Sequence, residues 1–400
     1  MNDKDVEGLI KTTARLINAT DLSYRRNLNS DIEYGTRLTI LKGFRGTGKT
    51  TLLLQHLKDK LSIKDTIFLS LDNIFFAEHK FLETIDFFYE KGYRTFILDE
   101  VHRYTGWSIE LKNVYDSYPD VKVLATSSSA LDIMKGESDL SRRADVYILR
   151  GLSFHEYLMY EYDINVPTFD FDNLLKSKDL LAEDYYEKHD IKRKFNSYLK
   201  KGYYPYFKES GKNYYPKMMS ALNQVIDIDL PAIFNIDYES TRQIKKLLSV
   251  ISRIAPFSPN IAKLSRTLNI PRSSILLFID YLESADVISV IKSGKKSDSA
   301  MTKPDKILLE NTNLLYALSG STNKGTIRET FVINALKGNH AIATPAKGDV
   351  MLDRKYTIEI GGKSKNVSQI YDMPNPILIK DDIVNGGEGI LPMWMLGFLK

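Results

Sequence analysis

The sequence predicts an α/β fold whose parallel sheet is followed by a helical subdomain and two further domains. Between about residues 33 and 150, short apolar runs alternate with amphipathic segments, which indicates a parallel sheet covered on both faces. A Gly-rich loop ending in Lys-Thr directly follows the first run, where such a sheet places its phosphate-binding turn. The expected strands are Leu38–Leu41, Thr66–Leu71, Thr95–Leu98, Val121–Ala125 and Val146–Leu149.

Length and composition limit the rest of the chain. Its 400 residues predict two to four domains, because one core usually serves ~100–200 residues. The 55 Lys and Arg against 51 Asp and Glu give a net charge of +4, so any nucleic-acid surface must be local. The absence of cysteine excludes disulfides, thiolate nucleophiles and cysteine-bound metals. No secretory signal and no run of ~18 apolar residues is visible, which predicts a cytoplasmic protein without a membrane partner.

The domain organisation follows from changes in pattern along the chain. A helical segment is expected over residues 1–32, the parallel-sheet core over 33–150 and a Tyr-, Lys- and Asp-rich helical subdomain over 151–238. A winged-helix domain is expected over 239–320 and an α+β domain over 321–400. The linker from Ser319 to Gly325 marks the last boundary, because Ser, Thr, Asn and Gly favour loops.

The Gly-rich loop fits the P-loop pattern G-x-x-x-x-G-K-[ST]. Backbone N–H groups of such a loop surround phosphate oxygens, and the following helix adds the positive end of its dipole. Lys49 is expected to reach the β- and γ-phosphates of ATP, and the Thr50 hydroxyl to bind Mg²⁺. A Gly-rich turn before a helix is the bland alternative. The predicted nucleotide-binding residues are Gly43, Phe44, Arg45, Gly46, Thr47, Gly48, Lys49, Thr50 and Thr51.

A second motif is the apolar run that ends in Asp99 and Glu100. At the carboxyl edge of a parallel sheet these side chains lie beside the phosphate loop. Asp99 is expected to hold the metal, and Glu100 to orient or deprotonate the attacking water. The alternative is a capping Asp99 beside a solvated Glu100.

The run Val121–Ala125 leads into hydroxyl side chains that include Ser127 and Ser128. One of these hydroxyls is expected to bond the γ-phosphate or its water and so report whether ATP or ADP is present. Serine clusters are also common in turns, so a purely structural role stays open.

Residues 33–160 resemble the AAA+ ATPases of a bacterial and archaeal group whose C-terminal domain is known as DUF4143. Arg45 matches the family's loop, whereas Thr126-Ser127-Ser128 replaces its usual Thr-Gly-Ser. Arg143 matches an arginine before the family's Leu-Ser-Phe turn, here Leu152-Ser153-Phe154. The resemblance implies that Arg143 stabilises charge on the transferring phosphoryl group, in cis or on a neighbour's site. Arg142 stands where the family has glycine, and a surface Arg-Arg pair is the alternative.

The segment after residue 240 has the order of a winged helix. Helices are expected over Ile244–Ile254, Ile261–Leu268 and Arg272–Ser284, with Pro271 at the turn and a basic loop at Gly294-Lys295-Lys296. Arg272, Ser273 and Ser274 on the expected recognition helix are offset by three acidic residues, Asp280, Glu283 and Asp286. DNA contact and a protein-interaction role therefore both stay open.

The last domain resembles the DUF4143 type, which is similar to PD-(D/E)xK nucleases. The family landmarks fall on Gly325, Glu329, Asp349 and Glu359. Gly361 stands in place of the catalytic lysine, and Lys363 comes two positions late, on the face of Glu359 if the strand continues. Gly361 and Gly362 are expected to end the strand, so nuclease activity is not expected.

The sequence therefore predicts an ATPase that uses Mg²⁺ and acts as a switch on C-terminal domains that engage double-stranded DNA. The catalytic residues are expected to be Glu100, Lys49, Arg143 and Ser128, and the metal ligands Thr50 and Asp99. A DNA-processing nuclease and a switch that acts on a protein partner are the alternatives. The sequence leaves the oligomeric state open.

Overall fold

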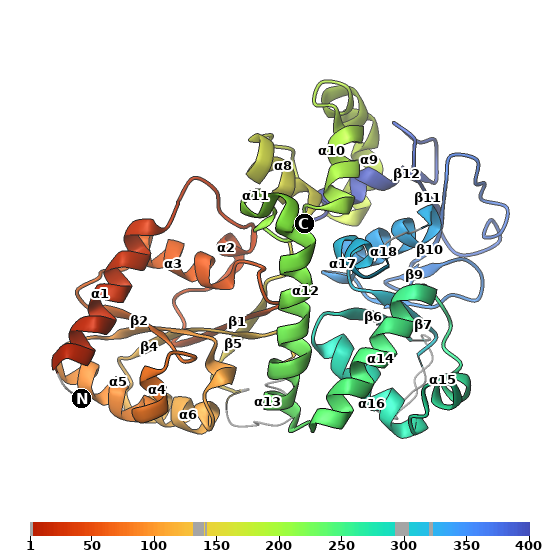
Figure 1. Ribbon diagram of the computed structural model, residues 1–400. Coiled ribbons are helices and arrows are strands. Elements are labelled where there is room, and N and C mark those ends of the chain that lie inside the picture. The colour runs from red at the N-terminus through yellow and green to blue at the C-terminus, as the bar shows by residue number, and fades with distance from the viewer. Residues whose placement is uncertain (1–2, 131–139, 141, 293–303, 320–322) are drawn as a thin grey trace. The chain divides into compact units, whose positions relative to one another are not determined.

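A computed structural model describes residues 3–130, 140, 142–292, 304–319 and 323–400 of the chain (Figure 1). The chain forms two compact units. Unit 1 consists of Met1–Gly151 together with Gln224–Ile236, and unit 2 consists of Leu152–Asn223 together with Asp237–Lys400. In these described ranges, no helix is long and apolar enough to cross a membrane.

Unit 1 contains a five-stranded parallel sheet with the strand order β2-β3-β4-β1-β5. All five predicted runs are confirmed as strands of an α/β fold. Their bounds are β1 Leu38–Gly43, β2 Thr66–Ser70, β3 Thr95–Asp99, β4 Lys122–Ser128 and β5 Asp145–Ile148.

Helices cover both faces of this sheet, with α3 on one face and α5 and α6 on the other (Figure 1). Successive strand residues alternate between the two apolar layers: Ile40 packs with α5 and α6, and Leu41 packs with α3. The helical elements are α1 Asp3–Ala19, α2 Leu28–Asp31, α3 Lys49–Lys60, α4 Phe75–Glu78, α5 Phe81–Glu90, α6 Trp107–Ser117 and α13 Leu230–Phe234, with a 3₁₀ turn at Val101–Arg103 and a π-helical turn at Val225–Asp229.

Strand register places the predicted motifs at one edge. Gly43 at the end of β1 pairs with Ser128 at the end of β4, and Ser70 at the end of β2 pairs with Asp99 at the end of β3. Because all strands are parallel, these residues share the carboxyl edge of the sheet, where doubly wound folds bind ligands.

Unit 2 begins with helices and continues into a small hairpin and a mixed sheet. The strands β6 Ile288–Ile291 and β7 Lys306–Leu309 form an antiparallel pair. The helical elements are α8 Phe154–Tyr162, α9 Phe171–Leu181, α10 Ile191–Lys200, α11 Phe207–Ser210, α12 Tyr214–Gln224, α14 Tyr238–Ile254, α15 Ile261–Leu268, α16 Arg272–Ser284, α17 Thr312–Ser319 and α18 Lys324–Lys337, with shorter turns at Ala182–Tyr186, Gly211–Asn213 and Met393–Phe398.

The second sheet of unit 2 has the order β12-β11-β10-β9-β8. Strands β10, β11 and β12 run parallel, whereas β9 pairs with β10, and β8 with β9, in the antiparallel sense. The bounds are β8 Ile342–Ala343, β9 Val350–Leu352, β10 Tyr356–Gly361, β11 Pro376–Lys380 and β12 Ile390–Pro392.

The helix-turn-helix segment of unit 2 has the predicted bounds for α15 and α16, whereas α14 begins at Tyr238, earlier than predicted. Asn269 ends α15 in the left-handed conformation with φ 55°, and Pro271 precedes α16. The basic loop at residues 294–296 lies outside the described residues. The winged-helix assignment and its DNA contact stay predictions.

Candidate nucleotide site

The phosphate loop connects β1 to α3 and requires its glycines. Gly46 and Gly48 have φ values of 85° and 96°, which side-chain-bearing residues rarely adopt. A Cβ on Gly43 would lie 2.3 Å from the backbone oxygen of Leu149, which follows β5. The loop therefore packs against the end of β5 in a way that only glycine permits.

Lys49 lies inside this loop. Its Nζ donates to the carbonyl oxygens of Gly43 and Phe44 at 2.9 and 3.3 Å, and the residue is 5% exposed. Burial lowers the pKa of Lys49, and the nearby Glu100 and Asp99 oppose that shift. The ammonium group thus lies within the loop, bonded to its backbone carbonyl oxygens, and its expected contact with the β- and γ-phosphates stays a prediction.

Arg26 braces the loop from outside the motif. Its guanidinium donates to the carbonyl oxygen of Thr47 at 2.7 Å and to those of Arg150 and Gly151 at 2.9 Å each. Sequence reasoning missed this residue, because an arginine in the segment between α1 and α2 carries no motif.

The predicted metal ligands contact each other. The Thr50 hydroxyl donates to Oδ1 of Asp99 at 2.7 Å, and the Thr126 hydroxyl donates to the same oxygen at 2.6 Å. Burial raises the pKa of Asp99, while these two hydroxyls favour its ionised form. A carboxylate and a hydroxyl at this spacing are oxygen ligands of the kind that Mg²⁺ prefers, so the residues fit the expected ion.

Glu100 sits in a strained position directly after β3. Its φ is 55°, a left-handed value that is uncommon outside glycine and that clusters at functional sites. Its N–H donates to the Thr126 hydroxyl at 2.9 Å, and its Oε2 lies 3.7 Å from Nη2 of Arg45. The structure therefore brings together the predicted base, the metal ligands and the loop arginine.

The two serines at the end of β4 contact His102. Ser127 and Ser128 are buried, and the N–H of Ser128 donates to Nδ1 of His102 at 3.2 Å. The Ser127 hydroxyl lies 3.5 Å from the same nitrogen. The predicted γ-phosphate role of these hydroxyls stays a prediction.

Arg143 is engaged elsewhere in unit 1. Its guanidinium forms two bonds to Asp116 on α6, at 2.8 Å from Nε and 3.0 Å from Nη2, and lies over the ring of Tyr115. This pair places Arg143 against α6, and its expected role on the transferring phosphoryl group, in cis or on a neighbour's site, stays a prediction. Arg142 is exposed.

Asp229 is a further charged residue at the site that sequence reasoning missed. It is 2% exposed, and its Oδ1 lies 3.4 Å from Nη2 of Arg45 and 3.5 Å from Nη1 of Arg103. Nothing in the local sequence marks it, because it follows the Asp99-Glu100 motif by more than a hundred residues. Its position depends on the segment Gln224–Ile236 returning to unit 1.

Unit 2 also gathers carboxylates at the end of a strand. Strand β10 ends at Gly361, as expected, and the side chain of Lys365 fills the space over that glycine. The Nζ of Lys365 lies 2.5 Å from Oε1 of the buried Glu359. Lys363, which was expected to share the face of Glu359 only if the strand continued past the glycines, is exposed. The lysine that contacts Glu359 is therefore Lys365.

The other landmark acids of unit 2 are paired with a lysine as well. Lys306 bonds to Glu329, and its Nζ lies 3.7 Å from Oδ1 of Asp349. Asp349 also accepts the N–H of Ile360 at 2.8 Å. Over the described part of the chain, no group of three or more His, Asp or Glu side chains is placed to hold a metal ion.

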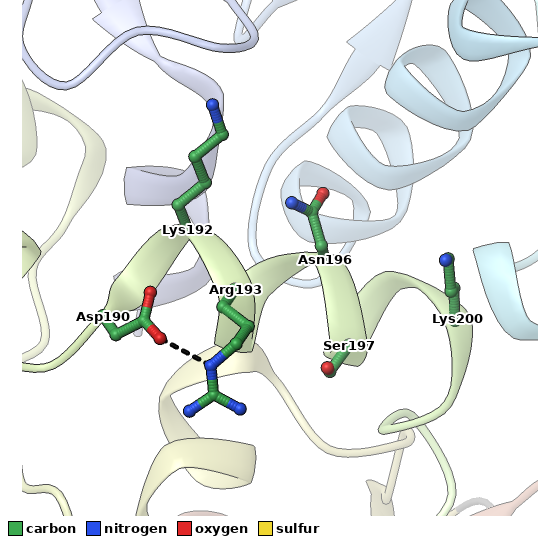
Figure 2. Close-up of a pocket in the computed structure, with 6 residues that line it drawn as sticks. All are labelled: Asp190, Lys192, Arg193, Asn196, Ser197 and Lys200. Carbon is green, nitrogen blue, oxygen red and sulfur yellow. Dashed lines mark hydrogen bonds and ion pairs between the residues drawn. The ribbon is translucent and has the colours of Figure 1, made fainter.

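Two open polar cavities lie on unit 2. The first, of about 430 Å³, lies along the exposed face of α10. Figure 2 shows the ion pair between Asp190 and Arg193 at the start of this helix, and Lys200 at its other end. The second, of about 700 Å³, is lined by Arg328, Lys363 and Lys365 among other polar residues. Both cavities carry exposed cations.

A family model and one sequence relative match parts of the chain. Residues 35–158 match the family model described as "AAA domain". The chain is 26% identical over 288 residues to "Uncharacterized protein MJ1637" of Methanocaldococcus jannaschii, a match that covers 68% of this chain. The chain spans only 60% of that relative's length.

Two solved structures share weak structural similarity with the chain. One is C. elegans PCH-2, at 16% identity and a TM-score of 0.26 over 71% of this chain and 69% of that one. The other is the S. cerevisiae Hsp104-ADP complex, at 16% identity and a TM-score of 0.26 over 69% of this chain and 38% of that one. Neither likeness is strong enough to carry an argument about function.

Proposed function

We propose that this protein is an ATPase that binds ATP with Mg²⁺ in the P-loop of unit 1 and hydrolyses it. One observation carries the proposal: the buried ammonium of Lys49 lies in a glycine-shaped loop next to the Thr50 hydroxyl and the Asp99 carboxylate. The family match over residues 35–158 supports it independently.

The residues of the loop bind the triphosphate. Backbone N–H groups between Gly43 and Lys49 and the start of α3 attract phosphate oxygens, and Lys49 neutralises part of their charge. On binding, the Lys49 ammonium exchanges its two carbonyl partners for the β- and γ-phosphates. Bound Mg²⁺, held by Thr50 and Asp99, supplies further neutralisation of the phosphate charge.

Glu100 activates the attacking water. Its carboxylate accepts a proton from water as the water oxygen forms a bond to the γ-phosphorus, and the bond between that phosphorus and the β,γ-bridging oxygen breaks to release ADP. The left-handed backbone at Glu100 and its N–H bond to Thr126 fix the direction of the carboxylate. Strain of this kind persists where the surrounding contacts impose it.

Phosphate release from ATP by purified protein tests the activity. Wild-type protein is expected to release phosphate in a magnesium-dependent manner, and Glu100→Gln to lose about 10²- to 10⁴-fold in kcat while it still binds ATP. Glu83→Gln, an equal change at an exposed position of α5, should leave turnover unchanged. Normal turnover by Glu100→Gln would refute the assignment of the base.

We further propose that ATP turnover switches C-terminal domains that engage double-stranded DNA. The support is the exposed cations of unit 2, which include Lys200 at the α10 cavity and Lys363 at the second cavity. Lysines at such sites contact phosphates without reading sequence. The near-neutral net charge of +4 makes local clusters of this kind necessary.

Fluorescence anisotropy with labelled duplex DNA over a range of salt concentrations tests this switch. Binding should weaken with salt, and Lys200→Glu or Lys363→Glu should reduce the salt slope by roughly 1 for each phosphate that the variant no longer neutralises. Lys60→Glu, on an exposed site of α3, is the matched control. Absence of salt-dependent binding would favour the protein-partner alternative.

A further inference from the structure

His102 is a buried titratable residue that the proposed chemistry does not yet use. It lies in the 3₁₀ turn Val101–Arg103, two residues after the predicted base Glu100, and its side chain is 1% exposed. A fully buried imidazole next to a catalytic carboxylate costs desolvation free energy, so its partners indicate what it does.

The hydrogen bond from Ser128 fixes the tautomer of this ring. Because the Ser128 N–H donates to Nδ1 at 3.2 Å, Nδ1 must carry a lone pair. In the neutral ring the proton is then on Nε2. That nitrogen lies 3.4 Å from Oε2 of Glu100 and 3.5 Å from Oδ1 of Asp229. Nε2 is buried and makes no hydrogen bond within the described residues, so its N–H lies near both carboxylates without a bond to either.

Asp229 and Glu100 form one cluster with His102 and Arg45. Arg45 contacts the same two carboxylates as His102, at 3.7 Å from Glu100 and 3.4 Å from Asp229. Burial opposes ionisation of Asp229, but His102, Arg45 and Arg103 outweigh it and hold its pKa below the usual value. Each of these two side chains therefore lies near both acids, and loss of Asp229 leaves Glu100 as the acid that both side chains share.

We propose that His102 and Asp229 are positioning residues for hydrolysis, which hold Glu100 and the loop residue Arg45 in their working orientation. The inference rests on the proposed ATPase function. His102 presents its Nε2–H to the Glu100 carboxylate 3.4 Å away, and Asp229 accepts a hydrogen bond from Arg45 and lies 3.5 Å from the imidazole nitrogen. The chain thereby makes hydrolysis depend on a segment outside the matched residues 35–158.

Asp229 belongs to the stretch Gln224–Ile236, which is part of unit 1 in space but continues into unit 2 along the chain at both ends. The carboxylate that contacts Arg45 therefore comes from a segment far along the chain from the phosphate loop.

Steady-state kinetics of single variants test the proposal. His102→Leu should lower kcat by about 10- to 100-fold and change the KM for ATP by less than about threefold, because a positioning residue acts on the chemical step. His102→Gln, which keeps an N–H donor, should recover at least about fivefold of that loss. Asp229→Asn should lower kcat about tenfold, whereas Asp227→Asn, on an exposed site of the same turn, should not. Wild-type kcat in folded His102→Leu would overturn the proposal.

The double variant separates a joint role from two independent ones. If both residues hold Glu100 as one unit, His102→Leu/Asp229→Asn should be no slower than the slower single variant. A loss equal to the product of the two single losses would overturn the shared role.

Nuclear magnetic resonance of wild-type protein with ¹⁵N-labelled histidine supplies a test that needs no variant. Nδ1 of His102 should resonate as an unprotonated nitrogen and Nε2 as a protonated one; the opposite pattern overturns the inference. If wild-type protein neither binds nor hydrolyses ATP, the proposed function fails first. If it hydrolyses ATP and the variants match it, only the positioning roles fail.

Discussion

The ends of β3 in unit 1 and β10 in unit 2 both carry buried carboxylates near a lysine, yet they are neutralised differently. In unit 1, Asp99 is held by two hydroxyls, and Lys49 bonds to carbonyl oxygens of its own loop. In unit 2, Glu359 is paired directly with Lys365, and Glu329 with Lys306. Hydroxyl partners leave the charge of a carboxylate available to a cation, whereas an ammonium partner already neutralises it.

The partners of a buried carboxylate therefore decide whether it can bind a metal ion, and the carboxylate motif alone does not. The hydroxyls of Thr50 and Thr126 preserve a place for a divalent cation, and the lysines of unit 2 supply a cation from the chain itself.

Removing the lysine of unit 1 should have the largest effect. Lys49→Ala deletes the ammonium that meets the triphosphate, so ATP affinity should fall by about 100-fold or more. Equilibrium dialysis with radiolabelled ATP measures it. Lys60→Ala, at the exposed end of α3, is the control and should bind ATP normally. Unchanged ATP affinity in Lys49→Ala would contradict the proposed difference between the lysines of unit 1 and unit 2.

Removing a hydroxyl beside Asp99 should have an intermediate effect. Thr126→Val keeps the shape of the side chain but deletes the donor to Asp99 and the acceptor for the Glu100 N–H. We expect kcat to fall about tenfold and stability to fall by about 1–2 kcal/mol, measured by phosphate release and urea unfolding. Thr39→Val in the buried part of β1 controls for loss of a threonine hydroxyl.

Removing a lysine of unit 2 should affect stability rather than turnover. Lys306→Met leaves Glu329 and Asp349 without their shared cation, which should destabilise unit 2 by about 1–3 kcal/mol while ATP turnover is retained. Lys292→Met, at an exposed site after β6, is the control. An equal loss of ATP turnover would contradict the separate roles of the two sites.

The pH dependence of this variant follows from Glu329. Burial raises its pKa above 4.5, so the folded state binds this proton more tightly than the unfolded state does. Stability from such a group falls as pH rises from the unfolded pKa through the folded one. Without Lys306 the pKa of Glu329 is raised further. The destabilisation of Lys306→Met should therefore be smaller at about pH 5 than at about pH 8.

The smallest effect is expected from Glu359→Ala in a plasmid nicking assay with Mg²⁺. Because Lys365 already neutralises Glu359, we expect neither the wild type nor the variant to nick supercoiled DNA. Nicking by the wild type that disappears in Glu359→Ala would support the nuclease alternative instead.

The sequence predicted unit 1 well because its signals are local. The five apolar runs, the loop from Gly43 and the pair Asp99-Glu100 each lie within a few residues, and parallel pairing alone brings them to one edge. His102 could have been found from its place just after Glu100. Asp229 could not, because its contact with Arg45 depends on a long excursion of the chain.

In unit 2, local pattern located the strand end but not the lysine. The glycines after Glu359 correctly predicted where β10 stops. Side chains alternate between the two faces of a sheet only within a strand. Beyond Gly361 this alternation therefore does not determine which lysine lies on the face of Glu359. Lys365, rather than Lys363, reaches Glu359 because the turn folds its side chain over Gly361.

Isothermal titration calorimetry of wild-type protein with ATP and Mg²⁺ tests the central claim most directly. We expect one nucleotide bound per chain, with affinity that drops when Mg²⁺ is omitted. Well-folded protein that takes up neither ATP nor ADP in the presence of Mg²⁺ would contradict the nucleotide site in unit 1.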